Sequence, residues 1–254
     1  MTSSNKGYVK VLQITDTHLF SDDEQEIFGV KSNKQLNKCL DHLISSDLNN
    51  TDYIFLTGDV SQDETIKSYE IIAEKLSSLN IPVYWIPGNH DDQNIMSGVF
   101  KQHRNFFHER SLSFPGWHII FMHSNSPGVP EGYFLEEEIR ALSKEIQSCK
   151  NDVKIGIVMH HHPYPVGTPL MDKYILQNNI DFWNIIEHTR VSLVICGHVH
   201  GDYSYHYKNI QIEASPATCF QLPKKTTELK ISPEIGYKIH YFKLNDYSSK
   251  AIIL

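Results

Sequence analysis

The stretch Val83–Asp91 reads V-Y-W-I-P-G-N-H-D, and the interpretation of the whole chain starts from it. Its four apolar residues predict a short buried strand, which the following Pro-Gly pair ends. The polar side chains of Asn89, His90 and Asp91 come directly after this pair. In open α/β folds ligands bind just beyond the carboxyl ends of strands, so these side chains are candidates for a site. Taken alone, the stretch is equally consistent with a polar turn that contains a histidine.

The composition is that of an ordinary globular protein. The chain has 254 residues, 40% of them hydrophobic and 21% charged, which is enough for a substantial core. The net charge is −7 and no basic stripe is present, which argues against a nucleic-acid partner. The N-terminus lacks an apolar signal core and no run reaches membrane-spanning length, so we expect a cytoplasmic protein without a membrane partner. The four cysteines have no C-x-x-C spacing, and we expect them to be reduced.

Four other apolar runs also end in polar motifs. They are Tyr8–Ile14 before T-D-T-H (15–18), Tyr53–Leu56 before T-G-D (57–59), Lys154–Met159 before H-H-H-P (160–163), and Ser192–Cys196 before G-H-V-H (197–200). Segments with helical spacing of apolar residues lie between the runs, as in the helix that Ser32 and Gln35 would begin with a capping box. We therefore expect a single domain, residues 1–254, in which strands alternate with helices and further strands from about residue 203 complete the sheets.

The five motifs together predict a metal site. Strands of a single sheet would bring all five motifs to one edge. Imidazole and carboxylate groups are suitable ligands for Zn, Mn or Fe, and no thiolate competes with them. A single short motif of this kind is more often a turn with a hydrogen-bonded histidine, but five in succession make that explanation untenable.

This series of motifs resembles the calcineurin-like metallophosphoesterases. The motifs that match the family, in order, are Asp16-Thr17-His18, Gly58-Asp59, Gly88-Asn89-His90-Asp91, His160-His161 and Gly197-His198-Val199-His200. Longer stretches are similar to the bacterial class III cyclic-AMP phosphodiesterases: L-Q-I-T-D-T-H-L-F (12–20), T-G-D-V-S-Q-D (57–63), G-V-P-E-G (128–132) and S-P-A-T-C-F-Q (215–221). The resemblance covers nearly the whole chain and weakens after about Leu222.

The resemblance implies an α/β fold in the form of a four-layer α-β-β-α sandwich, two mixed β-sheets flanked by helices, with two divalent metal ions. Iron or manganese is expected, and zinc is the alternative. The implied ligands of one ion are Asp16, His18, Asp59 and His200; Asp59 would bridge to the second ion, whose other ligands would be Asn89, His160 and His198.

The resemblance also implies roles around the phosphate. His90 would face the phosphate and help to protonate the leaving O3′, and Asp91 would orient its ring. The substrate contacts would be His18, Asp59, Asn89, His90 and His200, with His161 as a weaker candidate behind them. For His162 two interpretations are left, a loop residue or part of the pocket wall. One departure is His123, which stands where these enzymes usually have an aspartate.

The function that follows from the resemblance is hydrolysis of 3′,5′-cyclic AMP to 5′-AMP by attack of a metal-bound hydroxide, which would lower intracellular cyclic AMP. The expected partner is thus a small cyclic nucleotide. Two alternatives remain. The chain could be a broader phosphodiesterase for glycerophosphodiesters or 2′,3′-cyclic nucleotides, because the metal motifs address the phosphate and not the base. It could also be a metal-free interaction scaffold, although every expected ligand position is filled.

Overall fold

The computed structural model describes residues 6–126 and 128–254. The helices are α1 (Ser32–His42), α2 (Ile66–Ser77), α3 (Gln93–Phe100), α4 (Glu136–Ser148) and α5 (Asn179–Ile186), with a π-helical turn at Leu43–Asp47 and a 3₁₀ turn at Met171–Lys173. The strands are β1 (Tyr8–Ile14), β2 (Tyr53–Thr57), β3 (Val83–Ile86), β4 (Phe106–Phe107), β5 (Ser111–Phe114), β6 (Trp117–Phe121), β7 (Lys154–Val158), β8 (Val191–Cys196), β9 (Tyr203–Tyr207), β10 (Ile210–Ala214), β11 (Gly236–Lys243) and β12 (Tyr247–Ile253).

The strands form two mixed sheets of six strands each. The first sheet has the order β12-β11-β1-β2-β3-β4, and the second has the order β5-β6-β7-β8-β10-β9. In the first sheet β1 to β4 are parallel, and β11 pairs antiparallel with β1. In the second sheet β6, β7, β8 and β10 are parallel, and the edge strands β5 and β9 are antiparallel to their neighbours. Each sheet therefore has a parallel centre that follows the alternation of strands and helices in the sequence.

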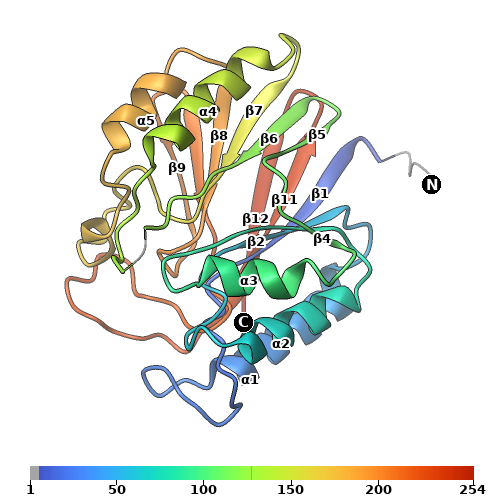
Figure 1. Cartoon of the computed structure of the whole chain (residues 1–254), viewed down its shortest axis with the longest axis vertical. Coiled ribbons are helices and arrows are strands. Elements are labelled where there is room, and N and C mark those ends of the chain that lie inside the picture. Colours follow the sequence, from blue (N-terminus) through green and yellow to red (C-terminus); the bar gives the residue numbers. More distant parts are fainter. Residues whose placement is uncertain (1–5, 127) are drawn as a thin grey trace.

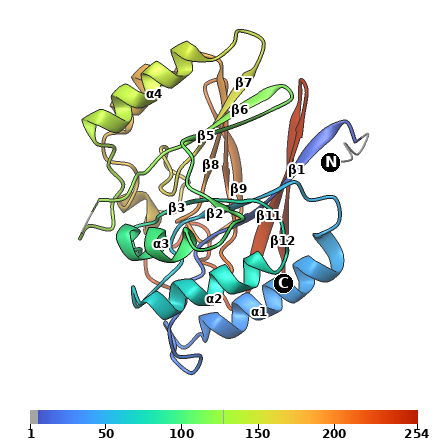
Figure 2. The ribbon, with the colours of Figure 1, turned by 45° about the vertical axis from the view of Figure 1, so that its right-hand side comes forward.

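The two sheets pack face to face and helices cover both outer faces, which confirms the expected four-layer sandwich. In Figures 1 and 2, α1, α2 and α3 cover the first sheet, while α4 and α5 cover the second. Three separate apolar clusters fill the spaces between the layers. The middle cluster joins the sheets and includes Phe55 and Ile86 from the first and Phe121 and Ile195 from the second.

One expectation about this architecture was wrong. The polar motifs do not lie on the edge of one sheet, because β1, β2 and β3 belong to the first sheet and β7 and β8 to the second. Apolar alternation cannot distinguish one large sheet from two stacked ones, since both bury their central strands on both faces. The strand ends still meet, because the two sheets pack with these ends on the same side (Figure 1).

Several local predictions changed in detail. Helix α1 begins at Ser32 itself, after Lys31, and the Ser32 hydroxyl donates to the His18 carbonyl at 2.6 Å instead of capping the helix. The short elements α3, β4 and β5 were not predicted. The cysteines are all free, as expected. Within residues 6–126 and 128–254, none of the helices combines the length and apolar character needed to cross a membrane. The expectation about an N-terminal signal segment rests partly on Met1–Asn5, which lie outside the described residues.

Candidate metal centre

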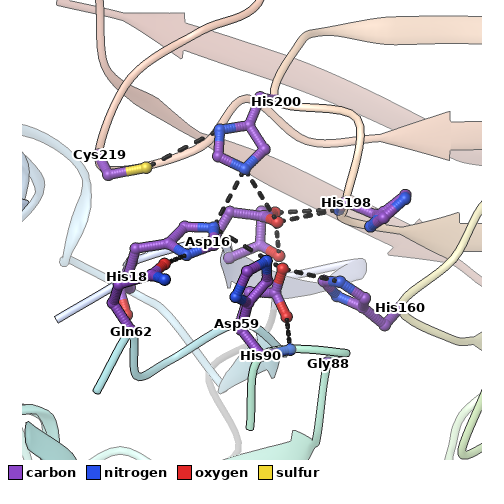
Figure 3. Close-up of polar contacts among 12 residues, drawn as sticks. Asp16, His18, Asp59, Gln62, Gly88, His90, His160, His198, His200 and Cys219 are labelled. Atoms are coloured by element: carbon purple, nitrogen blue, oxygen red, sulfur yellow. Dashed lines mark hydrogen bonds and ion pairs between the residues drawn. The ribbon is translucent and has the colours of Figure 1, made fainter. Parts of the chain in front are cut away.

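The seven predicted ligands come from five strand ends. Figure 3 shows all of them close together except Asn89, which lines the same cavity as four of the others. The loop after β1 carries two of them, and the ends of β2, β3 and β7 carry one each. The loop after β8 supplies the last two. In chain order these residues are Asp16, His18, Asp59, Asn89, His160, His198 and His200. Both sheets therefore contribute to one centre.

Backbone strain is concentrated at these positions. Five of the seven predicted ligands have positive φ: Asp16 (52°), His18 (45°), Asp59 (51°), His198 (68°) and His200 (45°). A non-glycine residue in this region costs about 1–3 kcal/mol and persists only where surrounding contacts enforce it. Backbone hydrogen bonds between the β1 and β2 loops provide such contacts: the amides of Asp16 and His18 donate to the carbonyls of Gly58 and Asp59, each at 3.0 Å.

The first group of ligands has the spacing of atoms that share a cation. The Nε2 atoms of His18 and His200 lie 3.2 Å apart. His200 Nε2 is 3.5 Å from an Asp16 oxygen, and His18 Nε2 is 3.7 Å from Asp59 Oδ2. Two ligands at the usual bond lengths around one tetrahedral ion are separated by ~3.3 Å. The two imidazole and two carboxylate groups thus fit one metal ion.

The second group contains buried polar atoms that have no hydrogen-bond partner among the described residues. These atoms are Asn89 Oδ1, His160 Nε2 and His198 Nε2. Buried polar atoms are nearly always satisfied, so three orphans in one place point to a missing ligand. Asp59 Oδ2 lies 3.3 Å from His160 Nε2 as well as close to His18, which is the position required of a carboxylate between two ions. The residues present therefore fit a two-metal centre.

Hydrogen bonds on the far side of each ring select the tautomer that a metal needs. The ring Nδ1 atoms of His18, His160 and His200 face the oxygens of Gln62 Oε1 (2.8 Å), the Thr57 carbonyl (2.7 Å) and the Phe220 carbonyl (3.0 Å), respectively. Because these oxygens can only accept, each Nδ1 carries the proton. Each Nε2 then presents a lone pair to the centre.

The buried ionisable groups of the centre would be stabilised by an added positive charge. Burial lowers the pKa of His18 and of His200 to about 4, so both rings are neutral near pH 7. Burial also acts against protonation of His160, but the adjacent Asp59 carboxylate outweighs it and raises the His160 pKa to about 9. Asp16 is fully buried, and its pKa is raised by that burial. The Asp59 pKa is held well below its usual range, because the neighbouring His160, His90 and His18 outweigh the effect of burial. Divalent cations would stabilise both of these buried carboxylates in the charged form.

His90 lies at the open side of the centre. Its side chain is half-buried and lines a cavity that opens over the centre. Its ring packs edge to face with the His18 ring, with 5.0 Å between the ring centroids. The His90 amide donates to Asp59 Oδ1 at 2.9 Å, which ties the position of this residue to the centre.

Asp91 makes contacts that differ from the expected one with the His90 ring. Its carboxylate accepts from the backbone amides of Val60 (2.9 Å), Ser61 (3.0 Å) and Gly88 (2.9 Å). Burial, reinforced by the charge of Asp59, raises the Asp91 pKa to about 6. The hydrogen bonds found for this carboxylate in the described part of the chain thus fasten the β3 turn to the β2 loop.

The other three histidines singled out in the sequence lie outside the cavity wall. The fully buried His161 ring is within hydrogen-bond distance of Ser124 Oγ (2.8 Å) and the Pro130 carbonyl (3.2 Å), so both nitrogens are engaged. His162 is also fully buried, with Nε2 3.5 Å from Asp172 Oδ1, so of the two alternatives it is a loop residue and not part of the wall of this cavity. His123 lies beside His108, with 2.9 Å between their Nε2 atoms.

A cavity of about 690 Å³ opens over the centre. Six of the proposed phosphate and metal contacts line it: His18, Asp59, Asn89, His90, His198 and His200. Sequence analysis did not single out two other residues of this wall, Gln62 and Phe220. Both lie in stretches that resemble the cyclic-AMP phosphodiesterases, and that was the only available signal.

Comparison with known proteins agrees with this geometry. The family described as calcineurin-like phosphoesterase matches residues 9–202 of the chain. A 3′,5′-cyclic adenosine monophosphate phosphodiesterase of Vibrio vulnificus is 33% identical over 228 residues, which are 89% of this chain and 82% of the relative. A probable cyclic nucleotide phosphodiesterase of Coxiella burnetii is 34% identical over 94% of both chains.

Solved structures share the fold at much lower identity. A dimetal phosphatase from Danio rerio superposes with a TM-score of 0.68 at 12% identity, covering 96% of this chain and 95% of the other. GAP50, described as the anchor in the inner membrane complex of Plasmodium, superposes with a TM-score of 0.69 at 14% identity, covering 97% and 85%. Likeness at this level establishes the fold alone. The family is established by the match of the family model over most of the chain and by the relatives above 30% identity. The chain belongs to the calcineurin-like phosphoesterase family and is a metallophosphoesterase related to bacterial cyclic-nucleotide phosphodiesterases.

Proposed function

We propose that this protein is a phosphodiesterase that hydrolyses 3′,5′-cyclic AMP to 5′-AMP and uses two divalent ions, iron or manganese, in this centre. The observation that carries the proposal is the set of inward-facing donor atoms, three of them buried with no hydrogen-bond partner in the described part of the chain, beneath an open cavity that His90 lines. Support for cyclic AMP as the substrate comes from the relatives named for that activity in Vibrio vulnificus and Escherichia coli, at 33% and 30% identity.

The charge of the proposed ligand set suits a phosphodiester. When bound, the two ions would supply activation of water and electrostatic stabilisation of the charge that develops on phosphate. Of the seven ligands, only Asp16 and Asp59 are carboxylates, so four positive charges are not fully cancelled. The neutral amide of Asn89 preserves this excess. A positive centre attracts a phosphodiester monoanion and favours the more charged transition state.

His90 is the proposed catalytic residue. Its ring faces the cavity without being one of the seven ligands, so it is free to contact the phosphate and pass a proton to the leaving O3′. His18, Asp59, Asn89 and His200 also line the cavity and would contact the phosphate together with it. Asp91 is a positioning residue in this proposal, because its bonds to backbone amides hold the turn that carries His90.

A substrate panel tests the proposal. Purified protein of measured metal content is supplied with Fe²⁺ or Mn²⁺, and then with cyclic AMP, cyclic GMP, 2′,3′-cyclic AMP and glycerophosphoethanolamine. We expect turnover of cyclic AMP with 5′-AMP as the product. Turnover of the other diesters without cyclic AMP would reject the proposed substrate in favour of a broader phosphodiesterase. Failure to retain metal under any loading condition would favour a scaffold.

A further inference from the structure

An exposed aromatic side chain stands at the edge of the cavity in an unfavourable conformation. Phe28 is 56% exposed and has φ of 51°, and Gly29 after it has φ of 79°. Ile27 and Val30 on either side exchange two backbone hydrogen bonds of 2.9 Å. This is a two-residue hairpin whose central positions both have positive φ, a turn in which asparagine and glycine are the favoured residues.

Folding gives no reason for phenylalanine at this position. A bulky side chain at positive φ is strained, and a ring that stays in water gains little from the hydrophobic effect. The ring packing found for Phe28 among the described residues is an edge contact with Phe220 at 5.9 Å between centroids. Strained residues of this kind cluster at ligand-binding sites, so the turn is best explained by something that the ring contacts.

The surroundings of Phe28 form an apolar extension of the metal centre. Phe220 is buried beside it and lies against the His200 ring at 4.6 Å, so the aromatic surface continues to the proposed ligands. Leu170, Met171 and Tyr174 line the same cavity from the loop after β7. Apart from Glu26, which precedes the turn, this part of the wall is mainly apolar, whereas the wall at the metal centre, which includes His90, is polar. The cavity thus has one end for a phosphate and another for an apolar group attached to it.

We propose that Phe28 and Phe220, together with the Leu170–Tyr174 loop, form a nucleobase subsite in which the Phe28 ring packs on the base of a nucleotide whose phosphate lies at the metal centre. This inference rests on the proposed function and deepens it. A nucleobase presents a planar π-face, and stacking on aromatic rings is a mode of recognition that every base allows. The polar head group of a glycerophosphodiester would gain little from Leu170 and Met171.

Substitutions at position 28 can distinguish the effect of the aromatic ring from the effect of the backbone conformation of the turn. Phe28→Asn removes the ring but keeps a residue that tolerates positive φ, so the hairpin is retained. Phe28→Tyr keeps the ring. Ile180→Ala, which removes an exposed apolar side chain from α5, is the matched control because Ile180 is 72% exposed and is not part of the cavity wall.

The measurement is the inhibition constant of 5′-AMP and of ribose 5-phosphate, each in competition with bis(p-nitrophenyl) phosphate on the metal-loaded enzyme. The two inhibitors differ at C1′, which carries adenine in 5′-AMP and a hydroxyl group in ribose 5-phosphate. We expect Phe28→Asn to raise the constant for 5′-AMP about 5- to 100-fold, as for the loss of one stacking contact, and to change that for ribose 5-phosphate less than twofold. Phe28→Tyr and Ile180→Ala should bind both inhibitors like the wild type.

Three outcomes would overturn the subsite. They are an equal effect of Phe28→Asn on both inhibitors, no effect on either, or a weakening of glycerophosphocholine as large as that of 5′-AMP, since the last would indicate a cage for an ammonium group. The result is independent of the substrate panel. If Phe28→Asn selectively weakens the binding of 5′-AMP but cyclic AMP is not turned over, the subsite is retained and the proposed reaction is rejected. If cyclic AMP is turned over but the variant weakens both inhibitors equally, the reaction is retained and the subsite is rejected.

Discussion

Several of the atoms that hold the side chains of the candidate centre lie outside the metal motifs. The Phe220 carbonyl and the Gln62 amide oxygen accept hydrogen bonds from two of the ligand rings. Backbone amides, in turn, bind the carboxylate of Asp91. Motif spacing predicts the types of ligand and their order. It does not predict these supports, because they are defined by distances across the fold and not along the chain.

Replacement of His90 should separate proton transfer from metal binding. We expect His90→Ala to retain both metal ions and to lower kcat by about 10²- to 10⁴-fold, the usual contribution of a general acid. Asn89→Ala should instead lose one of the two ions, because Asn89 Oδ1 is one of the orphaned atoms. Elemental analysis and kcat of the two variants provide the measurement. A metal-free His90→Ala protein would contradict the proposed role.

Substitution by alanine should be harmful at Gly88, where metal binding is lost, and beneficial at Gly98, where the folded protein becomes more stable. A Cβ atom on Gly88 would collide with the Asp59 carboxylate, lying 2.8 Å from its Cγ, so Gly88→Ala should displace this ligand and abolish metal binding. Gly98 lies in α3 with nothing within 4 Å of the added atom. Gly98→Ala should therefore stabilise the protein by ~0.5–1 kcal/mol. Metal content and urea unfolding distinguish the two. Normal metal binding by Gly88→Ala would contradict the close approach.

At the scale of elements, the structure shows how the short helix α3 follows the catalytic turn. Asp92 caps α3 by accepting from the amides of Asn94 and Ile95 at 2.8 and 3.0 Å. The same helix contributes Gln93, whose side-chain amide lies 3.3 Å from His123 at the end of β6. An aspartate before the helix is a recognisable N-cap signal. Eight residues that include a glycine are too few for a clear helical period, which is why α3 was not predicted.

The buried ring of His123 predicts a pH dependence of stability. Burial lowers the His123 pKa to about 4, helped by the charge of Arg110, whereas an unfolded histidine titrates near ~6.5. The unfolded chain therefore binds more protons between these values, and the stability contributed above pH 6.5 is lost as the pH falls towards 4. We expect His123→Gln to lose stability less steeply than the wild type over this window.

Urea unfolding of the metal-loaded protein at several pH values measures this effect. His188→Gln is the matched control, since its side chain is 89% exposed. Parallel curves for the wild type and His123→Gln would show that the buried ring does not take up a proton on unfolding.

At the scale of the molecule, the candidate centre lies where two sheets meet. The first sheet carries Asp16, His18, Asp59 and Asn89, and the second carries His160, His198 and His200. Neither sheet has a complete ligand set for the bridged pair of ions. We therefore propose that residues 1–254 act as one domain, because separation of the sheets would leave the donor atoms of each half without their ion.

Removal of the metals should consequently weaken the whole fold. Two ions bound at about 100 times their dissociation constant contribute at least ~2.7 kcal/mol, because they bind only the folded state. For a chain of this size, that corresponds to a fall in Tm of about 5–10 °C. Thermal unfolding before and after treatment with EDTA measures the change, and added Mn²⁺ should reverse it. An unchanged Tm in protein shown to have lost its metals would argue against the ions as a link between the sheets.

Local sequence was sufficient for the buried strands of both sheets, the helices with regular apolar spacing, and the order of the polar motifs at the strand ends. Hydrophobic periodicity and residue chemistry are properties of neighbours in the chain, and they also carried the family resemblance. The tertiary structure alone decided how the five motifs divide between the two sheets, that Asp91 binds backbone amides, and that Phe28 is exposed at the rim of the cavity. These features depend on contacts between segments that are distant in sequence, such as Phe28 and Phe220, and no local pattern records those contacts.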